Sequence, residues 1–163
     1  MKPNQIFETE NTIGIWDRDD QEFAEGICVA QSALWCRNML QGKRDLLSKP
    51  DYALAGPLQA IYEIRHKCNY TPFLASMGMK IDAETTEVGF SALEYLKKND
   101  GQYMLRYPGH SMGAKVSGSN YYFFDPEEGL FKYDSGDAMM RRIMRDYYDE
   151  MGENWTLRKV ELS

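Results

Sequence analysis

The spacing of apolar residues changes halfway along the chain, and this change restricts the possible folds more than any other feature. In the segment 28–40, apolar side chains recur at steps of four, three and four residues, which predicts a helix with one buried face made by Val29, Ala33, Cys36 and Leu40. The C-terminal half instead alternates apolar with polar side chains and is rich in Tyr, Phe and Val, which predicts strands. Helices followed by antiparallel strands indicate an α+β fold, in which a helical N-terminal part packs against a C-terminal sheet.

The alternation predicts five strands, separated by turn residues such as Pro108-Gly109. These strands cover residues 102–107, 111–117, 120–125, 130–133 and 155–162. After the first helix, further helices are expected at about 52–67, 88–98 and 137–148. Gly56 and Pro57 are expected to break the first turn of the helix at 52–67.

Length and composition indicate one domain that folds on its own. The chain has 163 residues, of which 43% are hydrophobic, and this is enough to bury a core. Its three cysteines include no Cys-x-x-Cys pair, so neither a disulfide framework nor a four-cysteine zinc site is expected. No apolar segment is long enough to span a membrane, and the first residues lack the apolar region of a secretory signal. These features favour a reducing, cytoplasmic environment.

Acidic residues are concentrated at the N-terminus. Residues 1–25 contain seven acidic and two basic side chains, which predicts a solvated acidic leader ahead of a domain at 26–163. Such a leader would also favour substrates with a basic segment through long-range attraction. The net charge of −6 argues against nucleic acid as a partner.

Two short patterns resemble functional motifs but lack the context that these motifs need. The segment 109–113 matches the Gly-x-Ser-x-Gly nucleophile elbow around Ser111, but a strand rather than a helix is predicted to follow it, and no histidine lies downstream as a base. His66 and Cys68 are two residues apart, yet a single short pair specifies no metal site. We therefore expect neither a serine esterase nor a metal centre.

Cys28 combines the features of a reactive thiol. It begins the predicted helix, where unpaired backbone amides and the helix dipole stabilise a thiolate. It also lies about 100° around the helix from Val29, off the apolar face. Cys36 lies on that face and is interpreted as a core residue. The position of Cys28 therefore favours a chemical role over packing.

His110 and Asp125 lie on neighbouring predicted strands, and the geometry of the turn between them brings them together. A two-residue turn at 117–118 would place residue 110 directly opposite residue 125, with Cβ atoms about 5 Å apart. A turn at 118–119 would place Asp125 opposite Met112, on the face of His110 and still within side-chain reach as a diagonal neighbour. Both registers predict a carboxylate that orients the imidazole.

Around these residues the sequence resembles the YopT-like cysteine proteases, which are bacterial effector proteases with a papain-like fold. The resemblance rests on Gly26-Ile27-Cys28, with Ser32 and Trp35 following on the predicted helix. It continues in the strand of His110 and in the stretch 121–131, so that it covers about a third of the chain.

The resemblance implies a papain-like cysteine protease that cleaves a target protein through an acyl-thioester. Cys28 would be the nucleophile, His110 the general base and then acid, and Asp125 the group that fixes the imidazole tautomer. Gln21, or Asn11 as the next amide, would stabilise the oxyanion together with the backbone N–H of Cys28. No metal or organic cofactor is implied.

The resemblance also implies a biological setting and leaves two alternatives open. The protein would be a toxin or effector that is made in the cytoplasm of its producer and secreted or injected into a target cell, and a cognate immunity protein would block its active site. One alternative is a glutamine deamidase or transglutaminase with the same triad, because an acyl-thioester forms from either kind of amide. The other is a non-enzymatic interaction domain whose many aromatic residues serve core and interface.

Overall fold

The computed structural model describes residues 1–11 and 26–163 of the chain. A seven-stranded sheet forms its centre, in the order β1-β6-β5-β4-β3-β7-β2, and all its neighbouring strands are antiparallel. The strands are β1 (Gln5–Glu8), β2 (Met79–Val88), β3 (Gly101–Tyr107), β4 (His110–Ser117), β5 (Asn120–Asp125), β6 (Gly129–Tyr133) and β7 (Asn154–Leu162). The helices are α1 (Cys28–Leu40), α2 (Tyr52–Ala60), α3 (Tyr70–Ser76), α4 (Gly89–Lys98) and α5 (Gly136–Asp146).

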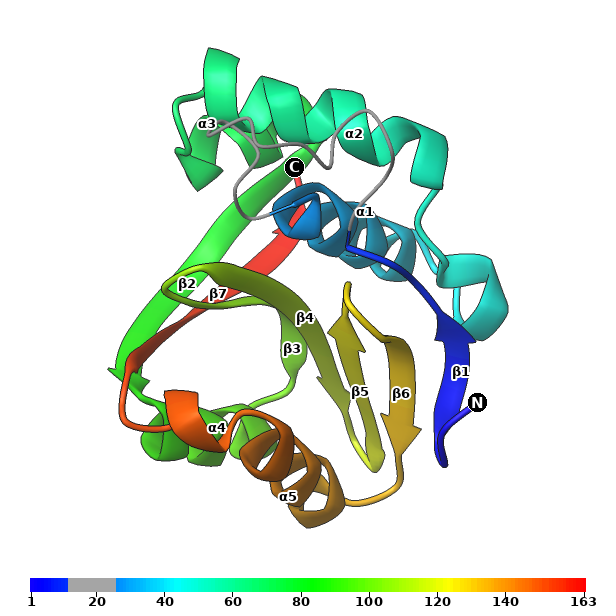
Figure 1. The fold of residues 1–163 in the computed structure, drawn as a ribbon, viewed down its shortest axis with the longest axis vertical. Helices are drawn as coiled ribbons and strands as arrows, with labels where there is room; N and C mark the ends of the chain where they lie inside the picture. The colour runs from blue at the N-terminus through cyan, green and yellow to red at the C-terminus, as the bar shows by residue number, and fades with distance from the viewer. Residues whose placement is uncertain (12–25) are drawn as a thin grey trace.

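The sheet lies between two groups of helices, so that the core has two halves. Helices α1, α2 and α3 cover one face and α4 and α5 the other (Figure 1). Successive residues of the central strands point to opposite halves of the core. Met104 and Phe124 pack with α1, whereas Leu105 and Phe123 pack under α4 and α5. Because both faces are covered, β3, β4 and β5 are buried along most of their length.

The five strands predicted in the C-terminal half are confirmed, with ends that differ by no more than one residue. The α+β class is confirmed as well. The predicted order of helices before strands is incomplete, however, because two strands of the sheet precede the five predicted ones.

The first of these additional strands is β1, an edge strand that pairs with β6. Phe7 on β1 is 4% exposed and its ring lies 6.1 Å from that of Phe124. The start of the predicted acidic leader is therefore part of the domain rather than a segment ahead of it. The single buried Phe7 in a polar stretch is too weak a pattern to predict a strand. The rest of the predicted leader, 12–25, lies outside the described residues.

The second additional strand is β2, which pairs with β7 at the other edge of the sheet. Its sequence is polar, and after Met79 its side chains are exposed or only partly buried. Apolar residues alternate only at its start, at Met79, Ile81 and Ala83, whereas residues 84–87 are polar on both faces. Strand β2 is held instead by its ladder to β7, which only the tertiary structure provides.

Helix α1 has the predicted bounds, but its environment differs from the prediction of one buried face. Every side chain from Cys28 to Cys36 is buried. One side packs tightly on the sheet, where an added Cβ at Gly113 would lie 2.6 Å from the ring of Trp35, and the other side is covered by α2. The separation of Cys28 from the apolar face therefore does not distinguish it from a core residue.

The predicted break at Gly56 and Pro57 is wrong. Helix α2 continues through Pro57 to Ala60, and a π-helical turn extends it from Ile61 to Arg65. A proline at this point removes the hydrogen bond to the carbonyl of Ala53. Ala53 is exposed, so water can hydrogen-bond that carbonyl in place of the helix.

The predicted helices at 88–98 and 137–148 correspond to α4 and α5. Within residues 1–11 and 26–163, no helix has both the length and the apolar character that crossing a membrane requires.

Candidate active site

Cys28 is the first residue of α1, and the chain approaches this helix in a turn at Gly26 and Ile27. Gly26 has a positive φ of 70°, which suits glycine, and Ile27 donates its N–H to the carbonyl oxygen of Asn11 at 2.9 Å. Ile27 is the N-cap residue, and its side chain makes no capping hydrogen bond. Instead the Gln59 side chain of α2 accepts a hydrogen bond from the N–H of Ala30 at 3.0 Å. The backbone N–H of Cys28, like the other N–H groups of a first helical turn, has no acceptor inside the helix.

His110 and Asp125 are brought together in the second of the two registers considered from the sequence. Ser117 pairs with Asn120, so the turn is at 118–119 and the register with a turn at 117–118 is wrong. The ladder continues to Gly113 and Phe124, and its extension places Asp125 opposite Met112. His110 and Asp125 are therefore diagonal neighbours on one face, and His110 Nε2 lies 3.0 Å from Asp125 Oδ1.

The thiol of Cys28 completes a chain of three hydrogen-bonded groups. Burial by itself lowers the pKa of His110, but side-chain hydrogen bonds to Asp125 and Cys28, together with their charges, raise this pKa to about 10. Since Nε2 of the ring faces Asp125, Nδ1 is the nitrogen left for Cys28. The site thus favours a protonated imidazole between two groups that can carry negative charge.

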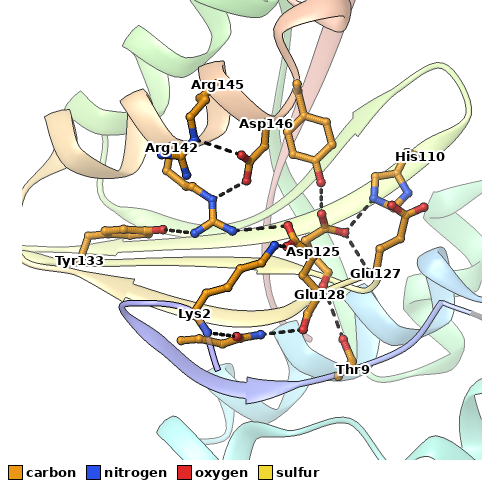
Figure 2. A network of polar contacts seen from close by, with 12 residues as sticks. Lys2, Thr9, His110, Asp125, Glu127, Glu128, Tyr133, Arg142, Arg145 and Asp146 are labelled. Carbon is orange, nitrogen blue, oxygen red and sulfur yellow. Dashed lines mark hydrogen bonds and ion pairs between the residues drawn. The ribbon is translucent and has the colours of Figure 1, made fainter.

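The Asp125 carboxylate accepts hydrogen bonds on both of its oxygens. Oδ1 accepts from His110 and from the backbone N–H of Glu127 at 3.0 Å, and Oδ2 accepts from the hydroxyl of Tyr147. Figure 2 shows Asp125 beside His110, with Glu127 of the following turn close to both. Asp125 therefore forms the turn, through its bond to the Glu127 amide, and also contacts the imidazole.

Of the two amide side chains considered for the oxyanion, Gln21 lies outside the described residues. Asn11 lies beside the first turn of α1. An added Cβ at Gly26 would be 3.0 Å from Asn11 Nδ2, and the Asn11 carbonyl oxygen accepts from Ile27. Asn11 is distant from Cys28 in sequence, so spacing alone did not favour it.

Ser111 and Cys36, which the sequence also brought into question, contact residues of the fold rather than the three-residue chain. Ser111 lies in β4 with its hydroxyl bonded to that of Tyr70, and the stretch after it is a strand, which lacks the helix of a nucleophile elbow. Cys36 is fully buried beside Gln102, and burial raises the pKa of its thiol to about 12. Cys36 is therefore a core residue, as predicted.

Within the part of the chain that the structure describes, His110, Asp125 and Glu127 form a group whose possible metal-ligating atoms lie within 4.8 Å of one another. His110 and Asp125 direct these atoms toward each other at 3.0 Å. A metal ion would have to separate this pair and displace the hydrogen bonds to Asp125. The arrangement suits proton transfer better than coordination.

The three side chains are buried: Cys28 is 0%, His110 4% and Asp125 1% exposed. Burial excludes water and strengthens the interactions among the three groups. It also means that a substrate carbonyl reaches the sulfur only when the packing around Cys28 opens.

A groove of about 620 Å³ adjoins the Asp125 turn. Its lining includes Lys2, Lys49 and four glutamates, Glu8, Glu10, Glu127 and Glu128. Glu127 belongs both to this groove and to the group with His110 and Asp125. The groove beside the three-residue chain is therefore predominantly acidic.

A helix with a thiol at its N-terminus, packed on an antiparallel sheet that carries an imidazole and a carboxylate on adjacent strands, is the arrangement of the papain-like cysteine proteases. The chain has this fold, as the resemblance in sequence implied.

Solved structures resemble this chain in fold, although their sequences differ widely from it. The avirulence protein AvrPphB of Pseudomonas superposes with a TM-score of 0.64 at 14% identity, covering 88% of this chain and 95% of its own. The ubiquitin-specific protease of the murine cytomegalovirus tegument protein M48, solved with a ubiquitin-based suicide substrate, gives a TM-score of 0.64 at 12% identity, covering 93% and 82%. No protein-family model and no curated protein sequence matches the chain.

The contact between Cys28 and His110 predicts the relative reactivity of the three thiols. At about pH 6.5, we expect iodoacetamide to alkylate Cys28 much faster than the equally buried Cys36, because a protonated imidazole stabilises the Cys28 thiolate. Peptide mass spectrometry at successive times measures the three rates. His110→Ala should slow Cys28 by about tenfold or more and leave Cys68 unchanged. Alkylation of Cys28 that His110→Ala does not slow would contradict a reactive thiolate.

Proposed function

We propose that this protein is a papain-like thiol protease that cleaves a target protein with Cys28, His110 and Asp125. The observation that carries the proposal is the hydrogen-bonded chain from Cys28 through His110 to Asp125 at the junction of α1 with β4 and β5. The papain-like fold supports it, because that fold presents these residue types in this arrangement.

The chemistry follows from the three groups. The Cys28 thiolate attacks the scissile carbonyl carbon, forming a C–S bond and an oxyanion. Protonated His110 gives its proton to the leaving nitrogen as the C–N bond breaks, which leaves an acyl-thioester. His110 then takes a proton from water, whose oxygen attacks the thioester, and the carboxylic acid product departs as the thiolate re-forms. Asp125 holds the imidazole orientation throughout both steps.

Asn11 is our candidate for the side-chain donor to the oxyanion, with the backbone N–H of Cys28 as the second donor. Its position beside Gly26 supports this assignment, whereas Gln21 lies outside the described residues. We expect Asn11→Ala to lower kcat by about 10²- to 10³-fold, as loss of one oxyanion donor does in other acyl-transfer enzymes. Gln21→Ala should change kcat much less. A larger loss in Gln21→Ala than in Asn11→Ala would reverse the assignment.

The substrate class follows from the groove beside the site. Its four glutamates favour a protein substrate with a basic segment, as the acidic N-terminus already suggested. In line with the resemblance to YopT-like effectors, we propose a toxin or effector that is secreted or injected into a target cell. A toxin of this kind would require an immunity protein that covers the active site in the producer.

Mass spectrometry of a susceptible cell that expresses the protein tests the proposed reaction. New protein N-termini that appear with the wild-type protein and not with Cys28→Ala would support proteolysis. A gain of about one dalton at glutamine residues, without new termini, would show deamidation and reject the protease. Target modification that is the same with both proteins would reject an enzymatic role for Cys28.

A further inference from the structure

The inner side of the site contains a group that the proposed mechanism does not use. Tyr147 follows the last residue of α5 and donates its hydroxyl to Asp125 Oδ2. It is distant in sequence from the other residues of the site, and no motif marks it. Asp125 is 1% exposed, so the hydroxyl of Tyr147 takes the place that a water molecule would hold on an exposed carboxylate.

The ring of Tyr147 also packs on the imidazole. The two rings are nearly parallel, with an interplanar angle of 29° and centroids 6.3 Å apart. Tyr107 lies 5.8 Å from both rings, and Trp155 meets the ring of Tyr147 edge-on at 5.9 Å. The hydroxyl is thus held against Asp125 by an aromatic cluster that also covers His110.

The end of α5 is fixed to the same turn that carries Asp125. Arg142 of α5 bonds to Asp146 and to the hydroxyl of Tyr133, and its Nη2 lies 3.4 Å from Glu128 Oε2 (Figure 2). Glu128 in turn donates its backbone N–H to the carbonyl of Asp125 at 2.9 Å. The arginine therefore fixes the distance between α5 and the Asp125 turn.

From these contacts we propose that Tyr147 is a positioning residue of the active site, which fixes the free oxygen of Asp125 so that the other oxygen stays on His110. The proposal rests on the function proposed above, because it concerns the same triad. Without the hydroxyl, Oδ2 would be buried with no donor. The carboxylate would then be held less firmly and would stabilise the protonated imidazole less.

An NMR titration of the histidine rings tests this directly, since the chain has two histidines and His66 serves as the internal reference. We expect Tyr147→Phe, which keeps the ring, to lower the midpoint of His110 by about one pH unit. The matched control is Tyr103→Phe, which removes a hydroxyl bonded to the carbonyls of Asn99 and Asp100. This control should leave the His110 midpoint unchanged.

Two variants, Tyr147→Phe and Cys28→Ala, distinguish failure of the positioning role of Tyr147 from failure of the proposed function. A His110 midpoint in Tyr147→Phe equal to the wild-type value would overturn the positioning role. The Cys28→Ala variant should lower the midpoint of His110 as well, because the thiol is one of the groups that raise it. If Cys28→Ala leaves the midpoint unmoved, the thiol and imidazole pair of the proposed function fails, whatever Tyr147→Phe shows.

A measurement on the wild-type protein covers the case in which Tyr147→Phe does not fold. A buried, hydrogen-bonded hydroxyl proton exchanges slowly with water and gives a resolved resonance. We expect such a resonance for Tyr147. Its absence at low temperature, while that of Tyr103 is present, would contradict the bond to Asp125.

Discussion

Replacing Cys28 with alanine should abolish modification of the target, lowering the rate by about 10⁴-fold or more, because no other group in the triad can form the thioester. The fold should persist, since Cys28 is a small buried side chain at the end of a helix. The rate of appearance of new N-termini measures the loss, and circular dichroism with thermal unfolding measures the fold.

The matched control is Cys36→Ala. Cys36 is equally buried on the same helix; its thiol donates weakly to the carbonyl of Tyr103 and to the sulfur of Met104, and it accepts from Gln102. This variant should lose stability while keeping activity. Activity that survives in Cys28→Ala, or that is lost equally in both variants, would show that the thiol of Cys28 has no specific chemical role.

Replacing Asp125 with asparagine should lower kcat by about 10²- to 10⁴-fold at unchanged fold. An amide has almost the shape of the carboxylate, but it neither stabilises a protonated imidazole nor fixes its tautomer. The comparison variant is Asp45→Asn, which changes a carboxylate that accepts from Tyr122 at 3.3 Å. If the two variants have equal activity, Asp125 does not orient the imidazole.

Asp125→Asn should also change how the free energy of unfolding depends on pH. The pKa of His110 is raised to about 10, so its protonated form stabilises the folded state. This contribution is complete below the unfolded pKa of about 6.5 and is lost as pH rises through about 10. Urea unfolding at pH 6 and pH 10 should therefore show a larger difference between wild type and Asp125→Asn at the lower pH.

Much of the site follows from local patterns in the sequence. The bounds of α1 come from helical spacing, and they place Cys28 at its first turn. The strands that carry His110 and Asp125 come from alternation, and both possible turns place the two residues on one face. Sequence alone did not select the turn, because Ser117, Gly118 and Ser119 are all suitable turn residues.

Local sequence patterns do not predict the other features, because these depend on contacts between distant segments. Strand β2 is polar over most of its length and pairs with β7, and β1 depends on one buried residue, Phe7. The complete burial of α1 between the sheet and α2 removes the contrast that placed Cys28 off the apolar face. Tyr147 reaches Asp125 from near the C-terminal end of the chain, and no spacing relates it to Cys28.

The sequence by itself determined which segments are helices and strands in the central and C-terminal parts, and hence the α+β class and the pairing of His110 with Asp125. Periodicity is a local property, and a hairpin with a short turn leaves few registers. The tertiary structure decided what meets this hairpin: the thiol of Cys28 and the hydroxyl of Tyr147. These contacts arise from packing across the sheet. The free energy of that packing depends on the whole core rather than on residues that are adjacent in sequence.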